Sequence, residues 1–193
     1  MKQNLLLAIT VVLFSAAWAG AADEVVFEDK FDGEKLAKGW KWLREEHPRA
    51  EYEMLVSGQG LVNLYRFFHR DASHPAPWDG EDGDVDVAAA VSRAAMEGAC
   101  PDCRTSLERF VTIYGAEAGN LALKVMATGG IYVAGGIAPK ILPVLRDGRF
   151  TEAFNAKGKF TDLMRAIPIR VVLNHETALL GAARMADDLA DAS

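Results

Sequence analysis

Two glycines stand where their type and spacing would allow a nucleotide to bind. Gly135 and Gly136 follow a short apolar run, Ile131 to Ala134, and precede a segment of helical spacing that begins at Ile137. A glycine pair at a strand-to-helix junction lets the backbone approach a phosphate or nucleotide closely, because no Cβ intervenes. The same pair is typical of a simple tight turn, and it completes neither a Walker motif nor a dinucleotide fingerprint. On the residues alone, both interpretations stay open.

Cys100 and Cys103 form a CxxC motif in the stretch GACPDCRTSL. A zinc site needs further ligands, and the sequence shows neither a second cysteine pair nor a histidine cluster, so no metal site is predicted. A redox motif would need a thioredoxin-like context, which is absent. We interpret the pair as two thiols that flank the start of a helix and that would be able to form a local disulfide in an oxidising compartment.

Composition and the N-terminus narrow the class of protein. The chain has 193 residues, half of them apolar, with a net charge of −6, and no basic stripe with interleaved aromatics. This argues against nucleic acid as the principal partner. Residues 1–22 have the form of a secretory signal peptide, with Lys2, an apolar run from Leu5 to Phe14 and small residues around Trp18. The signal predicts a secreted or periplasmic chain.

The elements that must position these residues follow from periodicity and capping signals. SGQG predicts a turn before a helix that ends near Phe68. Asp84 is expected to cap a second helix, which Gly98 closes. Thr105 to Glu108 have the form of a capping box. The helix opened by that box runs to about Ala127, with one face formed by Leu107, Phe110, Val111, Tyr114, Ala118, Leu121 and Val125.

Two short apolar runs predict buried strands in the second half of the chain. These are Ile131 to Ala134 and Ile169 to Leu173, and a last helix is predicted from Glu176 to about Leu189. Alternation of helices and strands favours an α/β fold with parallel strands. The helices from Ser106 and from Glu176 should be the longest.

The segment 23–50 contains FEDKFDGEKLAKGWKWLRE, which resembles the opening of secreted concanavalin-like jelly-roll domains. Such domains need about eight strands, and the later sequence does not supply them in alternating pattern. We therefore predict a fragment of that fold, with an uncertain junction near residue 50. It is expected to pack few apolar side chains into the later domain.

Four blocks further along resemble the C-terminal half of bacterial glucokinases. They are LVSGQGLVNLYR, CPDCRTSLERFVTIYGAEAGNLAL, GGIYVAGGIAPKIL and FNAKGKFTDLMRAIPIRVVLNHETALLGAA, and they occur in the family's order over about residues 51–185. The resemblance implies a glucokinase-like C-terminal lobe over 51–190, with an incomplete ribonuclease-H-like (actin-like ATPase) fold. It also implies glucose and ATP as substrates, magnesium as cofactor and a cytoplasmic location, which conflicts with the predicted signal.

The resemblance further assigns roles to three residues. Glu53 matches the glutamate that hydrogen-bonds the anomeric end of the sugar, whereas the residue alone is more simply an exposed acid at a helix entry. Gly135 and Gly136 match the adenosine motif of the family. The family's DxGGT loop, Asn-Asp base, GTGLG loop and ExGH motif do not occur in this sequence. We therefore predict no catalytic residue here, and no glucose phosphorylation by this chain.

Other functions stay open at this stage. An exported carbohydrate-binding protein would use Trp40, Trp42 and Trp78 to stack on sugar rings, although tryptophans more often fill cores. A non-catalytic interaction protein is a third possibility. Apolar helix faces that lack partners in a partial lobe would be exposed, which predicts a homodimer or aggregation.

Overall fold

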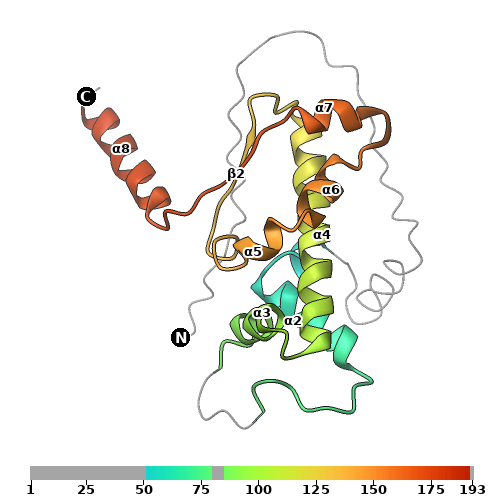
Figure 1. The fold of residues 1–193 in the computed structure, drawn as a ribbon. Coiled ribbons are helices and arrows are strands. Elements are labelled where there is room, and N and C mark those ends of the chain that lie inside the picture. Colours follow the sequence, from blue (N-terminus) through green and yellow to red (C-terminus); the bar gives the residue numbers. More distant parts are fainter. Residues whose placement is uncertain (1–50, 80–84, 192–193) are drawn as a thin grey trace.

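The computed structural model describes residues 51–79 and 85–191 of the chain. The predicted signal peptide and the segment 23–50, with Trp40 and Trp42, lie outside the described residues. One long helix runs through the middle of the molecule, and a two-stranded parallel sheet lies to one side of it (Figure 1). Within the described ranges, no helix combines the length and apolar character that a membrane span would require.

The helical elements and strands alternate as expected for an α/β chain. In chain order they are η1 (Tyr52–Met54), α2 (Gly58–His69), α3 (Val87–Glu97), α4 (Pro101–Lys124), β1 (Ile131–Val133), α5 (Leu142–Leu145), α6 (Arg149–Asn155), η2 (Gly158–Phe160), α7 (Thr161–Arg165), β2 (Ile169–Val171) and α8 (Thr177–Asp191). The two longest helices are α4 and α8, as predicted from the sequence.

The start of α4 corrects the predicted capping box. The helix begins at Pro101, and its N-cap is Cys100, whose Sγ accepts a hydrogen bond from the backbone N–H of Cys103 at 3.2 Å. Proline is favoured in the first turn because its missing N–H would have no helical partner there. Thr105 and Ser106 therefore lie inside the helix, and their hydroxyls donate to carbonyls one turn earlier.

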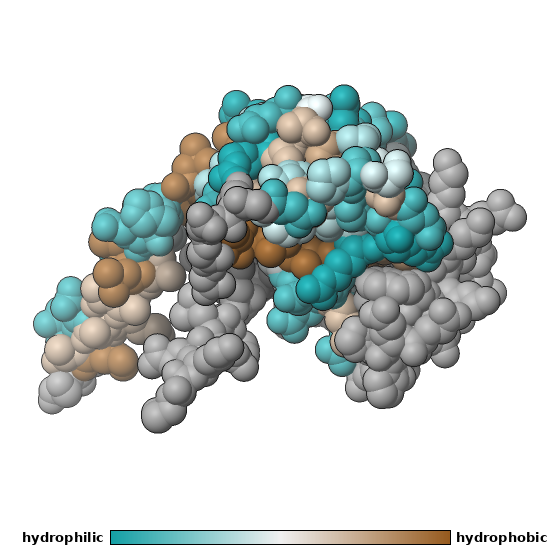
Figure 2. Space-filling view, turned by 90° about the horizontal axis from the view of Figure 1, so that it is seen from below, coloured by the Kyte–Doolittle hydropathy of each residue, from teal (hydrophilic) through white to brown (hydrophobic). Residues whose placement is uncertain are grey.

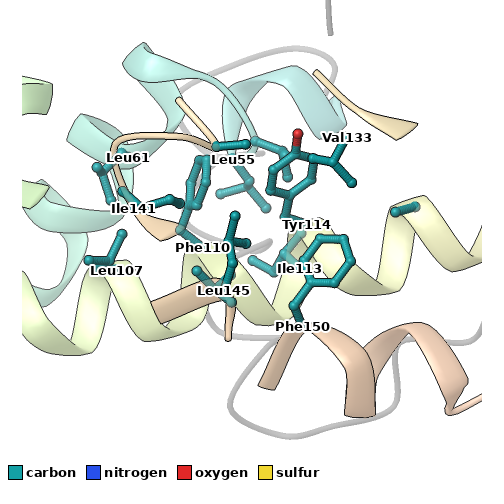
Figure 3. Close-up of a cluster of buried hydrophobic side chains, with 14 of the residues drawn as sticks. Leu55, Leu61, Leu107, Phe110, Ile113, Tyr114, Val133, Ile141, Leu145 and Phe150 are labelled. Atoms are coloured by element: carbon teal, nitrogen blue, oxygen red, sulfur yellow. The ribbon is translucent and has the colours of Figure 1, made fainter. Parts of the chain in front are cut away.

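The far end of α4 also differs slightly from the prediction. The helix ends at Lys124, so Val125 follows it and is 40% exposed instead of facing the core. The rest of the predicted face is buried or half-buried. Figure 3 shows Leu107, Phe110 and Tyr114 from this helix meeting Leu55, Val133 and Phe150 in one hydrophobic cluster.

Helix α6 packs closely against α4 because two glycines bring the backbones together. A Cβ at Gly115 would lie 2.2 Å from the carbonyl oxygen of Phe150, and one at Gly119 would lie 2.5 Å from that of Phe154. Lys157, which follows α6 and is buried, donates from Nζ to the carbonyl of Ala116 at 2.9 Å. The contact therefore depends on small residues in α4 and on one buried charged side chain.

Helices α2 and α3 pack on the first half of α4 and have well-defined ends. Ser57 caps α2, accepting from the N–H of Gly60 at 2.9 Å, so SGQG starts the helix and is not a separate turn. Asp86, not the predicted Asp84, caps α3. Gly98 closes α3 in the left-handed conformation, as predicted.

The strands β1 and β2 pair in parallel, which confirms the predicted direction. Ile131 pairs with Ile169 and Val133 with Val171. Ile131 and Val133 are almost fully buried, while β2 is only half-buried. The second strand of the pair is therefore the less covered one.

Helix α8 projects away from the other elements (Figure 1), and none of its residues is buried. Its apolar side chains Leu179, Leu180, Met185 and Leu189 are 57–71% exposed. Figure 2 shows apolar and polar residues side by side along this helix at the left of the view. The predicted exposure of apolar helix faces is thus present in α8.

Candidate functional site

The turn after β1 presents the two glycines to solvent. Gly135 has a φ of +106°, which glycine adopts without strain, so this position requires glycine for the turn itself. Gly136 has no such φ, and a Cβ built on it would meet nothing within 4 Å. Packing therefore does not require glycine at 136. The open space beside that residue is available to a ligand.

A cavity of about 220 Å³ lies beside Gly136 and joins segments far apart in the sequence. It is bounded by Gly136, Ile137 and Lys140 after β1, by Ser57 and Gly58 at the start of α2, and by Asp86, Ala88 and Ala89 at the start of α3. Pockets that enclose a drug-sized ligand usually measure about 300–1,000 Å³. This cavity is smaller, so it would enclose only part of a ligand of that size.

The chemistry of the cavity is suited to an anionic or hydroxyl-bearing ligand. The positive ends of the α2 and α3 dipoles and the Lys140 ammonium favour negative charge. The Asp86 carboxylate accepts from the N–H of Ala89 at 3.1 Å, so it is engaged as a helix cap. No other carboxylate lines the cavity among the described residues, so it lacks the set of oxygen ligands that holds a magnesium ion.

Glu53 lies in η1, just before α2, with an exposed side chain. Its carbonyl accepts from the Ser57 hydroxyl at 2.7 Å, which ties η1 to the cap of α2. Its carboxylate is not part of the cavity wall next to Gly136. The structure thus brings Gly136 to the start of α2, and leaves Glu53 beside that start and open to solvent.

A larger cavity of about 340 Å³ lies elsewhere, between the sheet and α5 and α6. Its wall is mainly aliphatic and aromatic, with Arg146 and Thr151 as the polar members, and neither glycine of the turn contributes to it. Among the residues that the structure describes, none in this wall is a carboxylate or histidine for acid–base work. Size alone therefore does not identify the site.

Cys100 and Cys103 are free thiols and are almost completely buried. Burial, with the hydrogen bond and charge of Cys100, raises the pKa of Cys103 well above its usual range. A thiol held in its neutral form is a poor nucleophile and metal ligand. The CxxC motif is therefore structural, as a helix cap and core packing.

Two features were not found from the sequence. Ser57, Asp86 and Lys140 contribute to the cavity, and the SGQG and APK stretches were the signals that would have pointed to Ser57 and Lys140. His69 and His74 lie together with Asp102, which the spacing of single histidines did not reveal.

Trp78 packs against the ring of Tyr65, with centroids 4.8 Å apart, at the edge of the core.

Comparisons with known proteins agree with one family. The Glucokinase family model matches residues 28–189. Its match begins inside the segment 23–50, and the domain boundary near residue 50 stays a prediction. A glucokinase of Synechocystis sp. is 45% identical over 148 residues, which is 70% of this chain and 42% of the relative. A glucokinase of Nostoc sp. is 40% identical over 158 residues, or 74% of this chain and 46% of the relative.

A solved structure supports the same assignment. The crystal structure of glucokinase from an Antarctic psychrotroph superposes with a TM-score of 0.66 at 33% identity, covering 78% of this chain and 45% of the other. The chain spans less than half the length of the relatives it matches. With a family match over most of its residues, the chain belongs to the glucokinase family.

Proposed function

We propose that these residues form the nucleotide-holding C-terminal part of a glucokinase, an enzyme that transfers a phosphoryl group from ATP to glucose. The observation that carries the proposal is the cavity in which the Gly136 turn meets the starts of α2 and α3 beside Lys140. The absent Cβ of Gly136 leaves room for an adenosine moiety. Gly135 contributes the turn that exposes it.

Glu53 is proposed to contact glucose. Its carboxylate is exposed, and hydrogen bonds from sugar hydroxyls are within the chemistry of a carboxylate. Its backbone link to Ser57 couples the sugar side of the site to the helix start that borders the nucleotide cavity. Magnesium would have to reach the site with the ATP phosphates, because the described part of the cavity wall offers no set of carboxylates for it.

Binding is proposed without phosphoryl transfer by this chain alone. Transfer needs a base for the sugar hydroxyl and donors that stabilise charge on the transferred group. Within the described residues, the carboxylate in the cavity wall is occupied as a helix cap and the Glu53 side chain lies outside that wall. The apolar face of α8 further supports self-association of the chain, as homodimers or larger species.

Titration of the chain with ATP tests the proposed site. We expect ATP to bind, and Gly136→Ala to weaken binding at least several-fold without changing the thermal midpoint, because its Cβ enters open space. Gly181→Ala in α8 is the control for ATP affinity, since a Cβ there also meets nothing within 4 Å and lies outside the cavity. Equal ATP affinity of Gly136→Ala and the unchanged chain would contradict the assignment.

A further inference from the structure

Three side chains that offer metal ligands converge at the corner between α2 and α4. His69 is the last residue of α2, His74 lies in the segment after it, and Asp102 is in the first turn of α4. Nδ1 of His69 is 2.9 Å and Nε2 of His74 is 3.1 Å from the same Asp102 oxygen, Oδ2. The three ligand atoms lie within 4.8 Å of one another.

The hydrogen bonding of His74 calls for a positive charge at this point. Its Nδ1 lies 3.1 Å from the carbonyl oxygen of Pro75, which only accepts, so Nδ1 carries the proton of that bond. In a neutral ring, Nε2 would then present a lone pair to the Asp102 carboxylate. Either a second proton or a metal ion bound between the two groups removes that repulsion.

Neighbouring groups hold the three side chains in orientations that suit metal binding. A metal-binding histidine commonly donates its second N–H to a backbone carbonyl, as His74 does to Pro75. The His69 ring stacks on Tyr65 with centroids 4.7 Å apart, which fixes its orientation. Asp102 is held in α4, whose first turn is capped by Cys100.

The site is also accessible and of suitable size. The side chains of His69, His74 and Asp102 are 20%, 40% and 23% exposed, so an ion can enter from solvent. Zinc–nitrogen bonds of about 2.0–2.1 Å place ligand atoms roughly 3.3 Å apart around one ion. The present ligand atoms lie within 4.8 Å of one another, so shifts of at most about 1.5 Å would bring them around one ion.

We propose that His69, His74 and Asp102 bind a divalent transition-metal ion of the zinc type, which clamps the end of α2 to the start of α4. Two imidazoles and one carboxylate favour zinc over magnesium, which prefers oxygen ligands. The clamp lies at the opposite end of α2 from Ser57, about 18 Å along the helix. It is therefore a structural site separate from the nucleotide cavity.

Zinc titration of the whole chain by calorimetry, in a phosphine reductant, tests the proposal. We expect one equivalent of Zn²⁺ to bind and to raise the thermal midpoint, with millimolar Mg²⁺ unable to displace it. His74→Gln and Asp102→Asn should each weaken binding at least tenfold. His175→Gln is the control, since His175 is exposed and lies outside the cluster.

Cobalt substitution distinguishes this site from the buried thiols without any mutation. We expect Co²⁺ to show the weak visible bands of nitrogen and oxygen coordination. A thiolate charge-transfer band would place the metal on Cys100 and Cys103 and overturn the proposal. The proposal would also be overturned if Zn²⁺ did not bind, or if the unchanged chain, His74→Gln and Asp102→Asn bound zinc with equal affinity.

Discussion

At the residue scale, Gly135 and Gly136 show how far a motif can be interpreted without coordinates. The strand before them was predictable from its apolar run, and so was their place in a turn. Which glycine serves the backbone and which leaves room for a ligand depends on φ and on the neighbouring atoms, which spacing does not encode. The His69–His74–Asp102 cluster was missed because Asp102 joins the two histidines only through the packing of α2 on α4.

Tyr114 provides a test of core burial through pH. Burial raises the pKa of its hydroxyl to about 12, from an ordinary value near 10. The unfolded chain then loses this proton at lower pH than the folded chain does. The contribution of Tyr114 to the free energy of unfolding is therefore complete below pH 10 and is lost as the pH rises through 12. This contribution amounts to at most about 2–3 kcal/mol.

We expect Tyr114→Phe to flatten this alkaline loss of stability, measured by urea unfolding between pH 8 and 11.5. The matched control is Tyr132→Phe, at an exposed position of β1. Burial also raises the pKa of Tyr65 and Cys103, so part of the loss will remain in the variant. A pH profile of Tyr114→Phe parallel to that of the unchanged chain would show that this ring is not buried as described.

At the element scale, helix and strand types followed from the sequence better than helix ends did. Apolar spacing predicted α4, α8 and both strands, and the alternation of helices and strands predicted the parallel direction. The starts of α3 and α4 were misplaced because several Asp, Ser and Thr residues compete as caps. The choice of Asp86 and Cys100 depends on which N–H groups the side chain reaches, and that is fixed by tertiary packing.

At the contact between α4 and α6, we expect a glycine-to-alanine substitution to destabilise the chain, although helix propensity alone would predict stabilisation. Alanine is intrinsically better than glycine in a helix by about 1 kcal/mol. At Gly115, however, the new Cβ would lie 2.2 Å from a backbone oxygen, which cannot move aside as a side chain would. We expect Gly115→Ala to destabilise the chain by at least about 2 kcal/mol in urea unfolding.

The matched substitution in α8 should act in the other direction. Gly181→Ala adds a Cβ in open space and should stabilise its helix by roughly 0.5–1 kcal/mol. If both variants behaved alike, the close approach of α4 and α6 would not exist in solution.

At the scale of the whole molecule, the described residues form one core around α4, with α8 and the face of β2 left uncovered. The glucokinase resemblance was visible in the sequence because its blocks keep their order. Because the sequence resembles only part of a larger fold, we expected some apolar helix faces to be exposed. The exposed apolar side chains of α8 agree with that expectation. The amphipathic pattern of α8 predicts that one side of the helix is apolar, but it does not identify the partner that this side would contact.

A coupled assay for glucose 6-phosphate, with purified chain of measured oligomeric state, ATP, magnesium and glucose, tests the central claim most directly. Among the described residues, the one carboxylate in the wall of the proposed nucleotide cavity caps α3, and no carboxylate set for magnesium lines it, so we predict no product above the enzyme-free background. Glu53→Gln should give the same background. Turnover that scales with protein concentration and disappears in Glu53→Gln would contradict the account, because it would reveal a catalytic centre in this chain.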